Sequence, residues 1–280
     1  MIPVAFEYAR ASSLDDAIAR LAASGAKAIA GGHSLVPLMK LRLSEPATLV
    51  DISKIPGLSG IRQNGGKIEI GATTTHSEIA ASTLLRDTCP IVAEAASEIG
   101  DPQVRNRGTI GGSIAHADPA ADFPAVVLAL DAEIVITGKS GQRVVKASNF
   151  FRGFYDVDLD AGELITAVQF EPIASAAYVK LHQRASHYAI VGAAAALTMK
   201  GGVIEAARVA VTGATTHAIR LAGVEQSLAG QKADGVAAAV QNAAADVPDV
   251  NVDLHASEDY RKAMIPVFVR RAVERAIERA

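Results

Sequence analysis

Two short glycine-pair loops constrain this chain more than any other feature of its sequence. The first loop, Ala30-Gly31-Gly32-His33-Ser34, lies where a predicted strand ends and a short helix, expected over 37–41, begins. Glycines there permit positive φ and the close approach of a ligand, and free N–H groups at a helix start attract an anion without any lysine. Because glycine pairs are common in ordinary turns, a purely structural role is the favoured interpretation of this loop when it is taken alone.

The second loop, Thr109-Ile110-Gly111-Gly112-Ser113, follows about 75 residues later inside a stretch rich in polar residues and glycine. Two such loops can hold the two halves of a pyrophosphate from opposite sides, which suits a dinucleotide. Neither loop has the three-glycine spacing of the Rossmann fingerprint, and no Gly-Lys-Ser or Gly-Lys-Thr occurs. The pair therefore indicates a dinucleotide site of another type.

Hydrophobic periodicity predicts an α+β fold. Leu14, Ala17, Ile18 and Leu21 recur at helical spacing after Ser12 or Ser13, and Gly25 ends that helix. Further helices are expected over 91–99 and 123–130, and strands over 27–30, 48–52, 133–137, 143–146 and 164–170, with a hairpin around Asn64-Gly65-Gly66. At 280 residues the chain has room for roughly two domains.

The composition of the chain changes after Glu171-Pro172-Ile173-Ala174-Ser175, where alanine becomes frequent. Three Ala-rich strands are expected beyond it, over 178–183, 190–199 and 204–212, followed by helices over 221–228, 235–244 and 257–280, the last kinked at Pro266. We therefore expect one domain over 1–175, with subdomains of about 1–55 and 56–175, and a second over 176–280.

Composition excludes several classes of function. The 27 basic residues are outnumbered by 30 acidic ones, which argues against a nucleic-acid partner. Cys89 is the single cysteine, so no iron–sulfur cluster or cysteine-based zinc site can form within this chain, and a small buried residue is the expected role of Cys89.

The histidines show no metal-ligand spacing, and no Gly-x-Ser-x-Gly nucleophile occurs, so we expect neither a metal nor a catalytic residue. The chain has no secretory signal at its start and no apolar run of membrane-spanning length, which predicts a cytoplasmic location.

Taken together, the two loops resemble the FAD-binding medium subunits of molybdenum hydroxylases, the family that includes the subunits of aerobic carbon monoxide dehydrogenase and xanthine dehydrogenase. AGGHSLVPLMKLRL at 30–43 and VRNRGTIGGSIAHADPAADFPA at 104–125 are similar to that family's two flavin motifs, and PVAFEYARASSLDDAIARLA is similar to its N-terminus. The resemblance covers the whole chain. It implies a two-subdomain PCMH-type FAD-binding domain, like that of vanillyl-alcohol oxidase, and then a small C-terminal domain with a three-stranded sheet and helices.

The resemblance also implies which residues hold FAD without a covalent bond. The first motif would contribute Ala30, Gly31, Gly32, His33, Ser34 and Leu35, and the second Thr109, Ile110, Gly111, Gly112 and Ser113. Asp122 would contact the ribityl and phosphate arm, Ile165 and Lys180 would lie nearer the ring, and Tyr188 would cover it.

Some of these residues have a second interpretation. A lysine near the flavin would stabilise the anionic reduced ring, whereas a lone lysine is more often a solvated surface residue. Tyr188 fits a buried core aromatic as well as a ring cover. His33 matches the position at which some vanillyl-alcohol-oxidase-type enzymes attach flavin covalently.

The function that the resemblance implies is electron transfer. A large partner subunit would carry the molybdenum cofactor and a small one two [2Fe–2S] clusters, in a dimer of heterotrimers, and FAD here would pass electrons to a quinone, oxygen or NAD. Any association with the inner face of the membrane would run through that complex. Carbon monoxide, nicotine, purines, aldehydes and heterocycles all remain open as substrates. Two alternatives are a stand-alone flavin oxidase, disfavoured by the roughly 105 residues after the first domain, and a nucleotide-binding module without activity.

Overall fold

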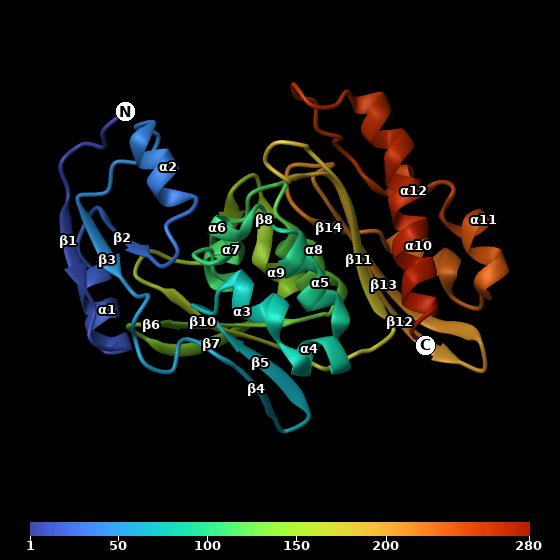
Figure 1. Ribbon diagram of the computed structural model, residues 1–280, viewed down its shortest axis with the longest axis horizontal. Helices are drawn as coiled ribbons and strands as arrows, with labels where there is room; N and C mark the ends of the chain where they lie inside the picture. Colours follow the sequence, from blue (N-terminus) through green and yellow to red (C-terminus); the bar gives the residue numbers. More distant parts are fainter.

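The computed structural model describes residues 1–280 and contains three larger sheets and one two-stranded sheet, β8–β9. Figure 1 shows the larger sheets side by side along the long axis of the molecule, with the short green helices between the second and the third. The expected α+β class is confirmed. None of the helices combines the length and the apolar character that a membrane span needs.

The first part of the chain forms a parallel three-stranded sheet in the order β1-β3-β2. Ser13 caps the first helix by accepting from the N–H of Asp16, and that helix buries Ala17, Ile18 and Leu21. The elements are β1 (Glu7–Arg10), α1 (Leu14–Leu21), β2 (Ala26–Ile29), α2 (Leu35–Lys40) and β3 (Thr48–Asp51). The carboxyl end of β2 therefore leads directly through the first glycine loop into α2.

The middle of the chain forms an antiparallel five-stranded sheet in the order β4-β5-β10-β6-β7. Its strands are β4 (Ile61–Asn64), β5 (Lys67–Gly71), β6 (Glu133–Gly138), β7 (Gly141–Lys146) and β10 (Leu164–Phe170), with β8 (Phe151–Gly153) and β9 (Asp156–Val157) apart. The helices are α3 (His76–Ala81), α4 (Thr83–Thr88), α5 (Pro90–Glu98), α6 (Pro102–Arg105), α7 (Ile110–His116), α8 (Asp122–Ala129) and α9 (Ala147–Phe150). Helix α8 is buried along its whole length because the third sheet packs on it.

The last part forms an antiparallel sheet of β11 (Ala176–His182), β12 (Ala189–Lys200), β13 (Val203–Thr212) and β14 (Ile219–Arg220). Alternate residues of β12 belong to different cores: Ala194 and Ala196 pack with the helices of the middle part, whereas Ala193 and Ala195 pack with the C-terminal helices. A strand buried on both faces between helices explains why the sequence there is rich in alanine. The remaining elements are α10 (Ala222–Leu228), η1 (Ala233–Gly235), α11 (Val236–Val240), η2 (Ala243–Asp246) and α12 (Glu258–Ile277).

Two expectations about elements were wrong. The last sheet has a fourth, two-residue strand, β14, which is too short to leave a periodic signal. The helix expected over 235–244 is broken into α11 and two 3₁₀ turns. Helix α12 continues through Pro266 and packs on β12, and the kink expected at Pro266 stays a prediction.

Candidate functional site: a cleft between the two glycine loops

A cleft of about 800 Å³ is lined by residues from all three parts of the molecule. The first part contributes β2 and the first glycine loop, the middle part contributes α7 and the segment around Ile165, and the last part contributes the loop before β12. Most of the predicted site residues line it. Those that do are Ala30, Gly31, Gly32, His33, Ser34, Leu35, Thr109, Gly111, Gly112, Ser113, Asp122, Ile165 and Tyr188.

The first loop keeps its backbone donors free. None of the N–H groups of Gly31, Gly32, His33 and Ser34 donates to a backbone carbonyl, so they remain available to an anion. Gly32 has φ of 77°, a left-handed conformation that favours glycine. His33 is exposed, and its Nδ1 lies 3.1 Å from the carbonyl oxygen of Gly31.

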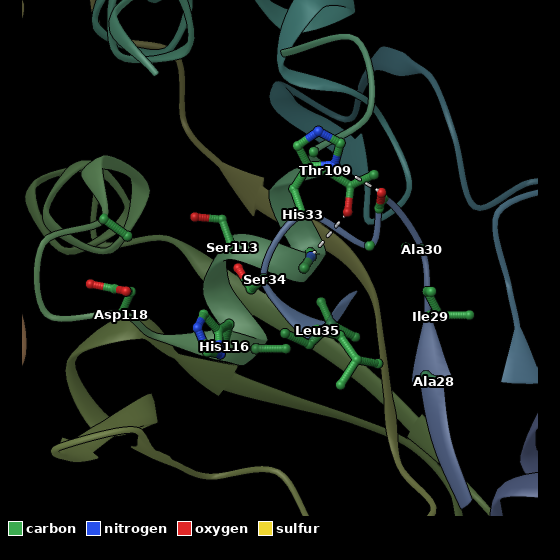
Figure 2. A pocket seen from close by; sticks show the side chains of 18 of the residues that line it. Ala28, Ile29, Ala30, His33, Ser34, Leu35, Thr109, Ser113, His116 and Asp118 are labelled. Atoms are coloured by element: carbon green, nitrogen blue, oxygen red, sulfur yellow. Dashed lines mark hydrogen bonds between the residues drawn. The ribbon is translucent and has the colours of Figure 1, made fainter. Parts of the chain in front are cut away.

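The two loops meet at Gly31. A Cβ on Gly31 would lie 2.1 Å from the carbonyl oxygen of Arg107 and 2.9 Å from the Cα of Gly108, inside the second motif and just before the second loop. Only glycine allows so close an approach of two backbones. Figure 2 shows the result, with Ser34 of the first loop near Ser113 of the second and His33 near Thr109.

The second loop is a capped helix start whose donors are largely used inside the protein. The Thr109 hydroxyl accepts from the N–H of Gly112 at 3.2 Å, and the N–H of Gly111 donates to the carbonyl of Ala72 at 2.9 Å. Ile110 is buried and does not line the cleft. The free main-chain donors therefore belong mainly to the first loop, and the second loop contributes the Ser113 side chain and close packing.

Asp122 anchors a buried polar cluster at the inner wall of the cleft. It is 4% exposed, and its Oδ1 accepts from the Tyr178 hydroxyl at 2.5 Å and pairs with the Nζ of Lys180 at 2.9 Å. Burial raises the pKa of Asp122, and the positive charge of Lys180 opposes that shift. The charge of Asp122, which lines the cleft, is therefore balanced by Lys180, which does not line it.

The structure contradicts one of the two interpretations of Lys180. Its side chain is 1% exposed, so it is not a solvated surface lysine. It does not line the cleft and is paired with Asp122, so a place of Lys180 near the flavin ring stays a prediction. Its Nζ also donates to the carbonyls of Glu98 at 2.7 Å and His187 at 2.6 Å, which ties three elements together.

Tyr188 lies on the loop between β11 and β12 and is 44% exposed, so it is not a core aromatic. The loop is held by Gln183, whose Oε1 accepts from the N–H of Ala185 at 2.7 Å, and by the carbonyl of His187, which Lys180 binds. Partial burial raises the pKa of Tyr188 to about 12, so its hydroxyl keeps its proton at neutral pH. The ring is placed at the mouth of the cleft.

Several lining residues were not among the predicted site residues. His116 and Asp118 lie within the second quoted motif, and Ile99 and Asp101 lie just before it, so the motif could have been extended to include them. His76 carries no such signal, because it is far from either motif in sequence.

Cys89 is fully buried as expected, and burial raises the pKa of its thiol to about 12.

Comparison with known proteins finds two family models that together match nearly the whole chain. Residues 4–171 match the family model for the "FAD binding domain in molybdopterin dehydrogenase", and residues 176–276 match that for the "CO dehydrogenase flavoprotein C-terminal domain". The carbon monoxide dehydrogenase medium chain of Hydrogenophaga pseudoflava is 39% identical over 99% of this chain and 98% of its own. The 6-hydroxypseudooxynicotine dehydrogenase complex subunit alpha of Paenarthrobacter nicotinovorans is also 39% identical, over 100% of this chain and 97% of its own.

Solved structures agree in fold over the whole length. A carbon monoxide dehydrogenase from Hydrogenophaga pseudoflava matches with a TM-score of 0.95 at 40% identity, covering 100% of both chains. Quinoline 2-oxidoreductase from Pseudomonas putida 86 matches with a TM-score of 0.93 at 33% identity, covering 99% of both chains. This chain therefore belongs to the family of FAD-binding medium subunits of molybdenum hydroxylases, and it is an FAD-dependent oxidoreductase subunit.

Proposed function

We propose that this chain is the electron-transfer subunit of a molybdenum hydroxylase, and that it holds FAD non-covalently in the cleft between its two glycine loops. The observation that carries the proposal is the contact of Gly31 with Arg107 and Gly108, which brings two loops from different subdomains together at a cleft of about 800 Å³. FAD, when bound, supplies the chemistry that links one-electron to two-electron transfer.

The residues of the cleft fit that cofactor. The free N–H groups of the first loop would hold the pyrophosphate together with the Ser113 hydroxyl, because these donors need no cation to bind an anion. Asp122 and Ile165 would line the arm and the ring, and Tyr188 would cover the ring at the mouth. Lys180 would act behind Asp122, by holding both Asp122 and the Tyr188 loop in place.

The partners follow from what this chain lacks. Its single cysteine cannot ligate a [2Fe–2S] cluster, which takes four protein ligands, so the clusters would reside on a small subunit and the molybdenum cofactor on a large one. Relatives are named as chains of dehydrogenases for carbon monoxide and for 6-hydroxypseudooxynicotine, so the substrate would be set by the large subunit. A domain boundary near residue 175 is supported by the start of β11 at Ala176.

The test is a tagged purification from the native host. We expect this chain to be recovered with one large and one small, cysteine-rich polypeptide, and with FAD visible in the absorption spectrum. Rapid mixing of the reduced complex with a quinone, oxygen or NAD then identifies the acceptor as the compound that reoxidises the flavin fastest. Recovery of the chain alone and without flavin would overturn the proposal.

A further inference from the structure

His76 is a buried cleft residue that neither flavin motif contains. It begins α3, is 5% exposed, and packs its ring against Phe123 with 5.4 Å between the ring centroids. It also lines the cleft. A histidine so deeply buried needs a reason, because an apolar side chain would occupy the same space without a desolvation cost.

The backbone around His76 is fastened to the second glycine loop. The N–H of His76 donates to the carbonyl of Gly108 at 2.9 Å, that of Ile110 to Thr74 at 3.1 Å, and that of Gly111 to Ala72 at 2.9 Å. These bonds fix the position of the imidazole relative to the loop that would hold the cofactor. His76 therefore belongs to the same rigid unit as the second motif.

The two ring nitrogens of His76 have different surroundings. Nδ1 is sealed from solvent and has no hydrogen-bond partner. The opposite edge lies against the loop, since a Cβ on Gly108 would lie 2.8 Å from Cδ2 and 2.9 Å from Nε2. A sealed nitrogen without a partner costs less as a bare acceptor than as an N–H, so the proton belongs on Nε2.

Resting on the proposed binding of FAD, we propose that His76 is a further FAD-binding residue, whose Nε2–H donates a hydrogen bond to an acceptor atom of the dinucleotide. Nε2 is the only ring nitrogen left to meet a ligand in the cleft. An imidazole with one nitrogen left without a hydrogen bond does not stabilise the fold, so its role at this position is ligand binding. Burial lowers the pKa of His76 to about 4, so the donor is uncharged at neutral pH.

The experiment compares two variants of similar shape in the full chain. His76→Gln retains a donor near the Nε2 position, whereas His76→Met has the same length without one. Flavin is removed, and the FAD dissociation constant is measured by titration with detection of flavin fluorescence. We expect His76→Met to weaken binding about tenfold and His76→Gln to stay within about threefold of the wild type. The unfolding midpoint of the flavin-free His76→Met chain should equal or exceed that of the wild type.

Thr73→Val is the matched control, because the Thr73 hydroxyl is also buried without a partner but does not line the cleft. Its FAD affinity should be unchanged. Equal affinities of the Gln and Met variants would overturn the inference while leaving the proposed function intact, whereas a wild-type chain that takes up no FAD would overturn the proposed function itself. Nitrogen NMR of the wild-type histidines gives a second measurement without relying on the variants' folding: an Nδ1–H tautomer at His76 would also overturn it.

Discussion

At the residue scale, Gly32 shows how a single backbone conformation can serve the cofactor. Gly32 and Gly66 both have positive φ, 77° and 86°, but only Gly32 lies in the cleft. Alanine at either position should lower the free energy of unfolding by about 1 kcal/mol, since both conformations disfavour a Cβ.

The two alanine variants should differ in cofactor binding. Gly32→Ala should weaken FAD binding at least tenfold, because alanine disfavours the φ of 77° and its Cβ would lie 3.3 Å from the Cγ2 of Val36, so the loop that carries the free N–H groups would shift. Gly66→Ala should bind FAD like the wild type, because a Cβ there meets nothing within 4 Å. Denaturant unfolding and FAD titration on the same samples separate the two effects. Equal FAD affinity of the two variants would contradict the assignment of the first loop.

His76 also makes a pH prediction. Because its pKa is about 4 in the folded chain and about 6.5 when unfolded, the unfolded state binds more protons between these values, and stability falls as the pH falls. The flavin-free wild type should therefore lose about 2 kcal/mol more than His76→Gln between pH 7 and pH 5. Urea unfolding at both pH values measures this, and parallel losses in the two proteins would count against a buried neutral imidazole.

At the element scale, the Tyr188 loop is held by Lys180 in addition to its own hydrogen bonds to Gln183. Replacing Lys180 with Met removes the bond to the His187 carbonyl and leaves Asp122 buried without its counter-ion. We expect a loss of about 3 kcal/mol in stability and faster tryptic cleavage after Arg184, which is exposed in that loop.

Lys146→Met serves as the control for Lys180→Met. Lys146 is an exposed lysine that pairs with Asp131 at 3.3 Å, so its replacement should cost less than about 1 kcal/mol. Cleavage after Arg184 should stay at the wild-type rate in this variant. An equally resistant loop in Lys180→Met would show that Lys180 does not hold Tyr188.

The element scale also shows where the sequence was informative. Strand Leu164–Phe170 was predicted because its apolar run is a local signal. The hairpin around Asn64-Gly65-Gly66 was predicted because its turn residues and the alternation over 67–71 are local too. Helix α7 was not predicted, because its Gly111-Gly112 pair disfavours a helix. The Thr109 cap and the packing of α7 on α8, β10 and β5 hold it instead. The ion pair between Lys180 and Asp122 could not be predicted either, since the two residues are distant in sequence.

At the scale of the whole molecule, the cleft lies where three parts of the chain meet. The glycine loops were found from sequence, but the meeting of Gly31 with Arg107 and the place of His76 depend on tertiary contacts that no local pattern encodes. Because FAD would bind the folded chain and not the unfolded one, FAD at one hundred times its dissociation constant should raise the free energy of unfolding by about 2.7 kcal/mol. Differential scanning calorimetry with and without FAD checks this, and an unmoved transition would contradict binding of FAD by the folded chain.

The central claim is that the cleft holds FAD without a covalent bond, and flavin release from the purified native complex tests it most directly. Acid precipitation should leave about one equivalent of FAD per copy of this chain in the supernatant, because main-chain N–H groups and packing hold it. Flavin that stays in the pellet would point to attachment at His33, as in a vanillyl-alcohol-oxidase-type enzyme. A supernatant and a pellet both free of flavin would contradict the account as a whole.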